Sequence, residues 1–292
     1  MPTKLLKCSR LAGAVAALLL AGTSQAQITA YQEQEWLNSP AASSHVGNVA
    51  GNAKNAAPDY RRYCVGCHGE LGDGNGENAV WLDPKPRDFT LGVFKCRSTP
   101  TGTLPTDQDL YDTIGRGLDR SNMPIWNTFT KQERADLVAW IKHFSPRWQK
   151  EKAGDPIQIP PEPEVTAERV KAGQDVFARV QCWKCHGVQG MANGPSAPTL
   201  TDDLGRPILP YNFSDGSRPK CGSTDQDLYR IFMTGLDGTP MPSLADNIKP
   251  DEAWDLVFYL RTLQPHNPFN VREREIARQL GLRPVNPNAP TQ

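Results

Sequence analysis

The chain has little of what would carry it into a membrane or onto nucleic acid. Only 38% of its 292 residues are hydrophobic, and beyond one run near the N-terminus no apolar segment is long enough to cross a bilayer. Lys and Arg number 32, and so do Asp and Glu, so no excess of positive charge favours a nucleic-acid partner. The abundant residues are Pro (26) and Gly (24), which favour small, loop-rich domains over one large sheet.

The apolar run near the N-terminus has the features of a secretory signal. Basic residues precede the apolar residues 11–21, and a small-x-small cleavage pattern ends at Ala26. A membrane anchor is the alternative, but the run is short for a membrane span. We therefore expect residues 1–26 to be a signal peptide, and the mature chain to be periplasmic, without a transmembrane segment and in an oxidising compartment.

The sequence repeats itself at an interval of 118 residues. The string CVGCHG begins at Cys64, and CWKCHG begins at Cys182. The string TDQDLY begins at Thr106 and again at Thr224, and in both copies a Met-Pro pair follows the histidine at the same interval of 55 residues. A repeat in register over this length indicates two domains with one plan.

Composition indicates where the two copies begin and end. Proline and charge dominate the segment between them, which predicts a semi-extended linker. The tail contains one short helical pattern near residues 272–280. After the signal peptide we expect an N-terminal arm without regular structure at 27–50, a first domain at 51–148, the linker at 149–165, a second domain at 166–264 and the C-terminal tail at 265–292.

Apolar residues recur at helical spacing in both copies. Thr130 begins a capping box, and an apolar stripe follows it at 137–144. Pro250 occupies a first helical position in the second copy, and Thr106 and Thr224 are N-caps of shorter helices. A helical pattern also leads into the first cysteine of each string, and no run alternates as a strand should. We therefore expect an all-α fold of two domains, about 100 residues each.

The repeated Cys-x-x-Cys-His string is the pattern for covalent attachment of haem c. A thioredoxin-like pair would need a βαβ setting, a zinc site would need two such pairs in one fold, and disulfides would leave both histidines unexplained. Small domains with few apolar residues also gain from a large, flat, apolar group in the core. We predict two covalently bound haem c groups, attached through Cys64, Cys67, Cys182 and Cys185, with His68 and His186 as ligands of the two irons.

With these motifs the sequence resembles a dihaem c-type cytochrome made of two tandem class I cytochrome c domains. The resemblance covers about residues 51–263 and implies a few helices wrapped around one haem in each domain. It also implies that a backbone carbonyl about twelve residues past each haem histidine accepts the ring N–H. Pro198-Thr199-Leu200 matches the family's Pro-x-Leu signature at that distance, whereas the first copy has Val80-Trp81-Leu82.

Met123 and Met241 lie in irregular segments before the last helix of each copy, where the family places its axial methionine. Their equal interval from the histidines favours ligation over an ordinary core position. A methionine–histidine pair closes both axial positions of the iron and raises its reduction potential. We predict Met123 and Met241 as the sixth ligands. The alternative ligands are His45, His143 and His266.

Cys96 and Cys221 stand in matching Lys-Cys-x-Ser-Thr strings outside the haem motifs. An interdomain disulfide suits an exported protein, whereas two buried free thiols are the alternative. A third interpretation, a thiolate ligand to iron, is disfavoured because the two cysteines lie at unequal intervals from their histidines, 28 and 35 residues. We favour the disulfide.

A six-coordinate iron favours one-electron transfer over catalysis. We therefore predict an electron carrier, not itself an enzyme, that exchanges single electrons with redox protein partners or serves as the haem subunit of a respiratory complex. The alternative is a dihaem oxidoreductase, thiosulfate dehydrogenase-like or peroxidase-like, with acid–base groups in the loops at 83–87 and 202–206. Arg116 and Lys220 are candidates for a basic docking rim, and ordinary solvated charges are the alternative for both.

Overall fold

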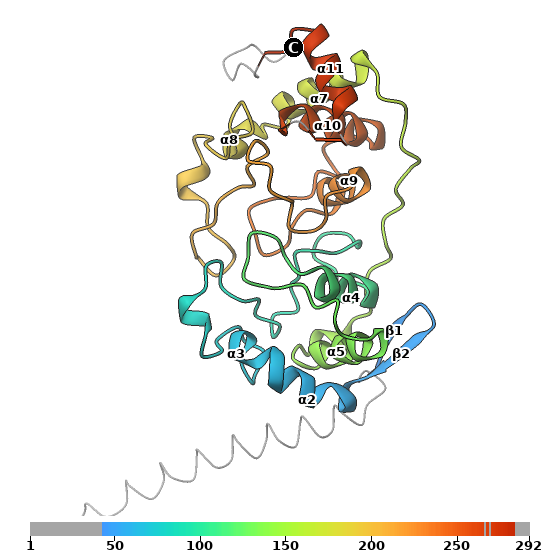
Figure 1. The fold of residues 1–292 in the computed structure, drawn as a ribbon, viewed down its shortest axis with the longest axis vertical. Coiled ribbons are helices and arrows are strands. Elements are labelled where there is room, and N and C mark those ends of the chain that lie inside the picture. The colour runs from blue at the N-terminus through green and yellow to red at the C-terminus, as the bar shows by residue number, and fades with distance from the viewer. Residues whose placement is uncertain (1–42, 266, 269, 284–292) are drawn as a thin grey trace, which may run out of the picture.

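The computed structural model describes residues 43–265, 267–268 and 270–283. The predicted signal peptide, most of the predicted arm and the end of the tail lie outside them. Two helical units stack along the long axis, the first from residue 43 and the second from residue 166 (Figure 1). Each unit has its own cluster of buried hydrophobic side chains. The expected all-α class with two tandem domains is confirmed, and in the described part no helix is long and apolar enough to span a membrane.

In the first domain the long helices α2 and α5 pack against each other. The capping box predicted at Thr130 and the N-cap predicted at Thr106 are both present, because each threonine accepts a hydrogen bond from a backbone N–H three residues on. The elements are β1 (Ser43–Val46), β2 (Val49–Asn52), α2 (Ala53–Tyr63), α3 (Val65–His68), the 3-10 turn η1 (Ala79–Trp81), α4 (Asp107–Arg116), α5 (Lys131–His143) and α6 (Arg147–Lys150).

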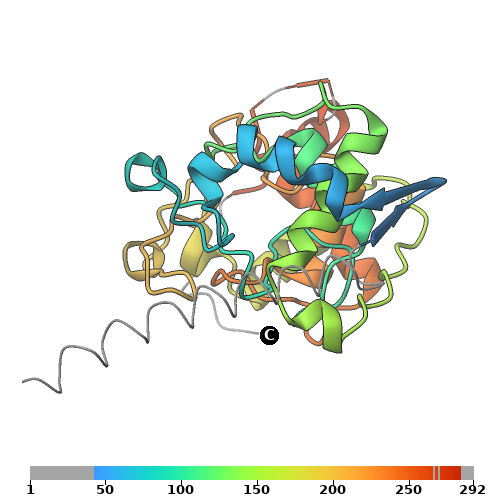
Figure 2. The ribbon, with the colours of Figure 1, turned by 90° about the horizontal axis from the view of Figure 1, so that it is seen from below.

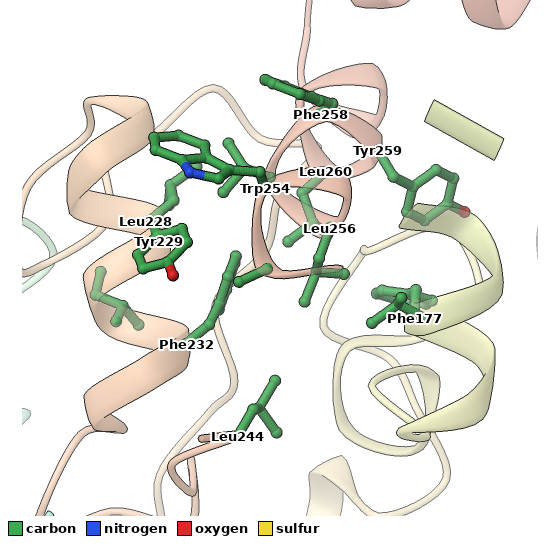
Figure 3. Close-up of a cluster of buried hydrophobic side chains, with 14 of the residues drawn as sticks. Phe177, Leu228, Tyr229, Phe232, Leu244, Trp254, Leu256, Phe258, Tyr259 and Leu260 are labelled. Atoms are coloured by element: carbon green, nitrogen blue, oxygen red, sulfur yellow. The ribbon is translucent and has the colours of Figure 1, made fainter. Parts of the chain in front are cut away.

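The second domain repeats this plan around α10, which is more deeply buried than the corresponding helix α5 of the first domain. Trp254 of α10 lies beside Tyr229 of α9, and Tyr259 on the other side of α10 meets Phe177 of α7, with ring centroids 4.9 and 5.4 Å apart (Figure 3). The tail helix predicted near residue 272 is also present. The elements are α7 (Ala167–Arg179), α8 (Trp183–His186), the 3-10 turn η2 (Ala197–Thr199), α9 (Asp225–Thr234), α10 (Pro250–Leu263) and α11 (Val271–Gln279).

Residues 43–52 form the hairpin β1–β2 beside α5 (Figure 2). The prediction that the chain has no strand is therefore wrong, and so is the prediction of an irregular arm for residues 43–50. Its two-residue turn places Gly47 at φ +56°, a left-handed conformation that favours glycine. The Ser44 hydroxyl donates to the Ala135 carbonyl at 2.7 Å. A Cβ on Gly51 would lie 2.2 Å from the same carbonyl oxygen, so this strand position requires glycine. Strands of four residues are too short to show alternation in the sequence.

After α6, residues 151–166 run in an extended conformation along one side of both domains (Figure 1). The backbone N–H of Ile157 donates to the Ser98 carbonyl at 2.8 Å, so this linker is held against the first domain. The short helix α6 extends into the predicted linker, and its Trp148 is buried against Phe94, with ring centroids 6.4 Å apart.

A disulfide joins Cys96 of the first domain to Cys221 of the second, with an Sγ–Sγ distance of 2.07 Å. Both sulfurs are bonded to each other, which leaves neither free to bind iron as a thiolate. Two ion pairs also cross the boundary between the domains. The fully buried Arg97 side chain pairs with Asp237 at 2.7 Å, and Arg120 pairs with Asp215 at 2.9 Å, in both cases across the two domains.

We expect the paired substitution Cys96→Ser and Cys221→Ser to lower the free energy of unfolding by about 2–5 kcal/mol. The disulfide links residues 125 positions apart, so its loss frees a long loop in the unfolded chain. Denaturant unfolding of the haem-loaded protein measures the loss. If two thiols are alkylated in the denatured, unreduced wild-type chain, the disulfide is absent and the prediction fails.

Candidate functional site

The two repeated strings fold into identical single turns of helix, α3 and α8. The backbone N–H of His68 donates to the Cys64 carbonyl at 2.9 Å, and that of His186 donates to the Cys182 carbonyl at the same distance. Side chains three and four residues apart lie on one face of a helix, so each turn presents its histidine beside its first cysteine. The strings occupy separate domains, which excludes their convergence on one zinc site.

The ring of each histidine is held in one tautomer. His68 Nδ1 lies 3.1 Å from the Arg87 carbonyl oxygen, and His186 Nδ1 lies 2.8 Å from the Tyr211 carbonyl oxygen. A carbonyl can only accept, so Nδ1 carries the proton and the Nε2 lone pair is available to a metal. Burial lowers the pKa of both histidines and keeps the rings neutral, the form that binds metal.

These acceptors correct the expectation that the carbonyl lies about twelve residues past the histidine, at Pro198 or near Val80. The turns η1 and η2 that contain those residues are held against the first half of the string. The Asn78 N–H donates to the Gly66 carbonyl, and the Ser196 N–H donates to the Lys184 carbonyl, both at 2.8 Å. The chain returns to the histidine only after the next loop, 19 residues on in the first domain and 25 in the second.

A phenylalanine two residues after each acceptor residue packs on the histidine ring. Phe89 stacks on His68 with ring centroids 4.4 Å apart, and Phe213 lies 5.1 Å from His186. The backbone N–H of each phenylalanine donates to a glycine carbonyl, Gly72 or Gly190, at 2.7 Å. The two phenylalanines are out of register in the repeat because the second loop is longer. In the sequence, the only sign of these two phenylalanines is that both domains have one in the loop after the haem string.

Met123 and Met241 lie in loops with the same hydrogen-bond frame. The backbone carbonyl of each methionine accepts from the N–H of Leu118 or Leu236, at 3.1 and 3.0 Å. The N–H of each methionine donates to a hydroxyl two residues before it, at 3.2 Å. This hydroxyl is supplied by Ser121 in the first domain and by Thr239 in the second.

A glycine at the end of α4 and of α9 permits these loops to close. Gly117 and Gly235 both have φ +68°. A Cβ on Gly117 would lie 2.7 Å from the Pro124 carbonyl oxygen, and one on Gly235 would lie 2.5 Å from the Ser243 nitrogen. The backbone around each methionine therefore rests directly on a glycine. The interdomain ion pairs also reach these loops, since Arg120 and Asp237 precede the two methionines.

The first string and Met123 line one cavity. Its lining includes Cys64, Cys67, His68 and Met123, and most of the remaining lining is apolar. Burial raises the pKa of Cys64 to about 12, so the thiol is not ionised near neutral pH. Apolar and aromatic side chains at the cavity include Leu82, Phe89, Phe94, Leu110, Ile114, Trp126, Phe129, Leu137 and Ile141.

The second domain gathers the corresponding groups on its hydrophobic core. Cys182 and Met241 pack against the same buried cluster, which includes Phe213 beside His186. Burial raises the pKa of Cys182 to about 12, as it does for the equivalent cysteine of the first domain. The first cavity thus combines a neutral imidazole, a thioether and paired thiols with an apolar lining, and the second domain carries the same groups at the same intervals, with Cys182 and Met241 on its hydrophobic core. This donor set fits a large apolar ring with a central iron.

The alternative histidine ligands lie elsewhere. His45 is in the hairpin, where its backbone N–H donates to Asp107 at 2.8 Å. His143 ends α5 with its ring 5.1 Å from Trp140 and 4.8 Å from Phe144. Neither residue lines the first cavity, and His266 lies outside the described residues.

Known proteins resemble both halves of the chain. Residues 170–264 match the family model of cytochrome c, and residues 51–141 match that of cytochrome c oxidase, cbb3-type, subunit III. Among solved structures, a chain of the reducing HAO-like protein complex of Kuenenia stuttgartiensis is 41% identical, with a TM-score of 0.70. The alignment covers 73% of this chain and 96% of that chain. No curated protein matches the chain.

Proposed function

Because this chain belongs to the dihaem c-type cytochromes, with one cytochrome c domain in each half, we propose that it passes single electrons between redox proteins through two haem groups. The observation that supports this most is the shared frame of the two methionine loops. In the first domain His68 and Met123 line the same cavity, and the same backbone frame holds Met241 in the second. Iron with both of these ligands exchanges electrons without an open position for a substrate.

Each residue of the two sites has a role in this proposal. The cysteines hold the haem edge, the histidine nitrogen binds iron, and the carbonyl on Nδ1 makes the ring a stronger donor. The methionine sulfur would be the other protein ligand of the iron, and a thioether ligand would raise its reduction potential. Haem c supplies the one-electron chemistry when bound. The proposed ligands are Cys64, Cys67, His68 and Met123 in the first domain, and Cys182, Cys185, His186 and Met241 in the second.

We place the carrier in the periplasm as the haem subunit of a complex with an HAO-like protein. Support comes from the solved chain of the reducing HAO-like protein complex, because this sequence covers 96% of that chain. The interdomain disulfide also suits an oxidising compartment. Affinity purification of the tagged, haem-loaded chain from native cells tests the assembly. Recovery of the chain without any haem-containing partner would contradict it.

The visible spectrum of the purified protein tests whether it is a carrier or an enzyme. We expect the oxidised protein to show a methionine-to-iron charge-transfer band of an intensity that corresponds to both haems. We also expect the reduced protein to be unchanged by carbon monoxide, because neither iron has an open position. A high-spin signal or rapid carbon monoxide binding at either haem would instead indicate an oxidoreductase with an open site.

A further inference from the structure

Two lysines meet at the boundary between the domains and line the cavity of the first. Lys95 and Lys220 immediately precede the two cysteines of the interdomain disulfide, whose Cα atoms are 5.1 Å apart. Both lysines line the first cavity, and among the described lining residues Lys220 alone comes from the second domain. Lys85 and Arg87 line it too, and no Asp or Glu of the described chain does. The wall is therefore apolar and cationic, with no carboxylate.

Neither lysine has a partner among the described residues, in a part of the molecule where other cations are paired. Arg97 and Arg120, at the same interface, each pair with a carboxylate of the second domain. Lys95 and Lys220 make no hydrogen bond or ion pair with the rest of the described chain. A half-buried cation without a partner is costly, because burial removes water without supplying a counter-charge.

The pKa values of both lysines are lowered, as expected for buried cations without a counter-charge. The pKa of Lys95 is lowered to about 8, first by burial and then by the charges of Arg87 and Lys220, with Asp202 acting in the opposite direction. Burial also lowers the pKa of Lys220, and Arg120 and Arg87 add to the effect against Asp83. The cations repel one another more strongly than the neighbouring carboxylates attract them. An anion in the cavity would reverse this imbalance.

We propose that Lys95 and Lys220 bind the propionate carboxylates of the haem in the first domain, so that the second domain completes the haem site of the first. This inference rests on the proposed function, because it requires haem in this cavity. Haem is an apolar ring with two carboxylates on one edge, which matches an apolar cavity in which Lys95 and Lys220 have no partner among the described residues. The disulfide holds the two lysines close to each other. The position of the second domain therefore affects the electrostatic potential at the first haem.

The substitution Lys220→Gln tests the proposal in the full, haem-loaded chain. A cation near the ring stabilises the added electron, so its loss disfavours reduction. We expect the equilibrium constant for reduction of one haem to fall about tenfold, which is about 59 mV for a one-electron couple. The Met241→His background separates the two haems, because it moves the potential of the second haem far below that of the first. In this background the shift caused by Lys220→Gln should appear in the first haem. Lys220→Arg, which keeps the charge, should retain the wild-type potential.

Arg218→Gln is the matched control, because it removes the same charge from the same loop at an exposed side chain. An equal shift in Arg218→Gln, no shift in Lys220→Gln, or a shift confined to the second haem would overturn the proposal. A crystal structure of the haem-loaded wild type decides independently of any variant. Both Nζ atoms should lie about 3 Å from a propionate oxygen of the first haem, and separation beyond hydrogen-bond distance would refute it. Absence of haem from the wild type would instead refute the proposed function.

Discussion

Replacing Met123 with histidine should lower the reduction potential of one of the two haems by a few tenths of a volt, because axial-ligand identity sets haem potentials over about 0.8 V. A thioether is a weak donor that favours reduced iron, whereas an imidazole donates more strongly and favours the oxidised state. Potentiometric titration followed in the visible spectrum should show one transition moving and the other staying. The methionine-to-iron band should lose about half of its intensity.

Two further substitutions make this result specific. Met241→His should act in the same way on the second haem, since the two loops share one hydrogen-bond frame. Met191→His is the matched control, because Met191 is 45% exposed and has no counterpart in the first domain. Unchanged potentials and an undiminished band in Met123→His would show that the sixth ligand is another group.

The paired substitution Cys182→Ala and Cys185→Ala should reduce the haem content of the chain from two groups to one. The haem would no longer be covalently held in the second domain, whose Cys182 and Met241 pack on the hydrophobic core. We also expect loss of helical signal from this domain, because a domain of this size buries limited apolar surface without its prosthetic group. Haem content by pyridine haemochrome and helicity by circular dichroism measure the two effects.

The equivalent pair in the first domain, Cys64→Ala and Cys67→Ala, should leave the other haem in place. The variant with both Cys96→Ser and Cys221→Ser is the control, since it removes two cysteines that attach no haem in this account. It should retain both haem groups. Two covalently bound haems in the Cys182→Ala and Cys185→Ala variant would refute the assignment of the attachment sites.

The repeat and the helix caps could be predicted from the sequence because their causes are local. Thr106, Thr130 and Thr224 each form the capping box that their spacing indicates. Pro250 begins α10 as its fixed φ favours. An interval of 118 residues predicted the parallel methionine loops, whose backbones match hydrogen bond for hydrogen bond.

Features that depend on the paths of loops could not be predicted in this way. The acceptors for the histidine rings, Arg87 and Tyr211, lie at different intervals in the two domains, because the second loop is six residues longer. The family pattern pointed to Pro198, but the turn η2 that contains it is held against Lys184 instead of the His186 ring. Lys220 was considered for an exposed docking rim, whereas the structure turns it into the first cavity. Only the packing of the two domains places it there.

The most direct test is whether the chain carries two covalently bound haem groups. It is made by measuring the intact mass under denaturing conditions, after export in cells that mature c-type cytochromes. We expect the mass of the mature polypeptide plus two haem groups, because thioether bonds survive denaturation. The bare polypeptide mass, from a chain that was exported and folded, would contradict the account.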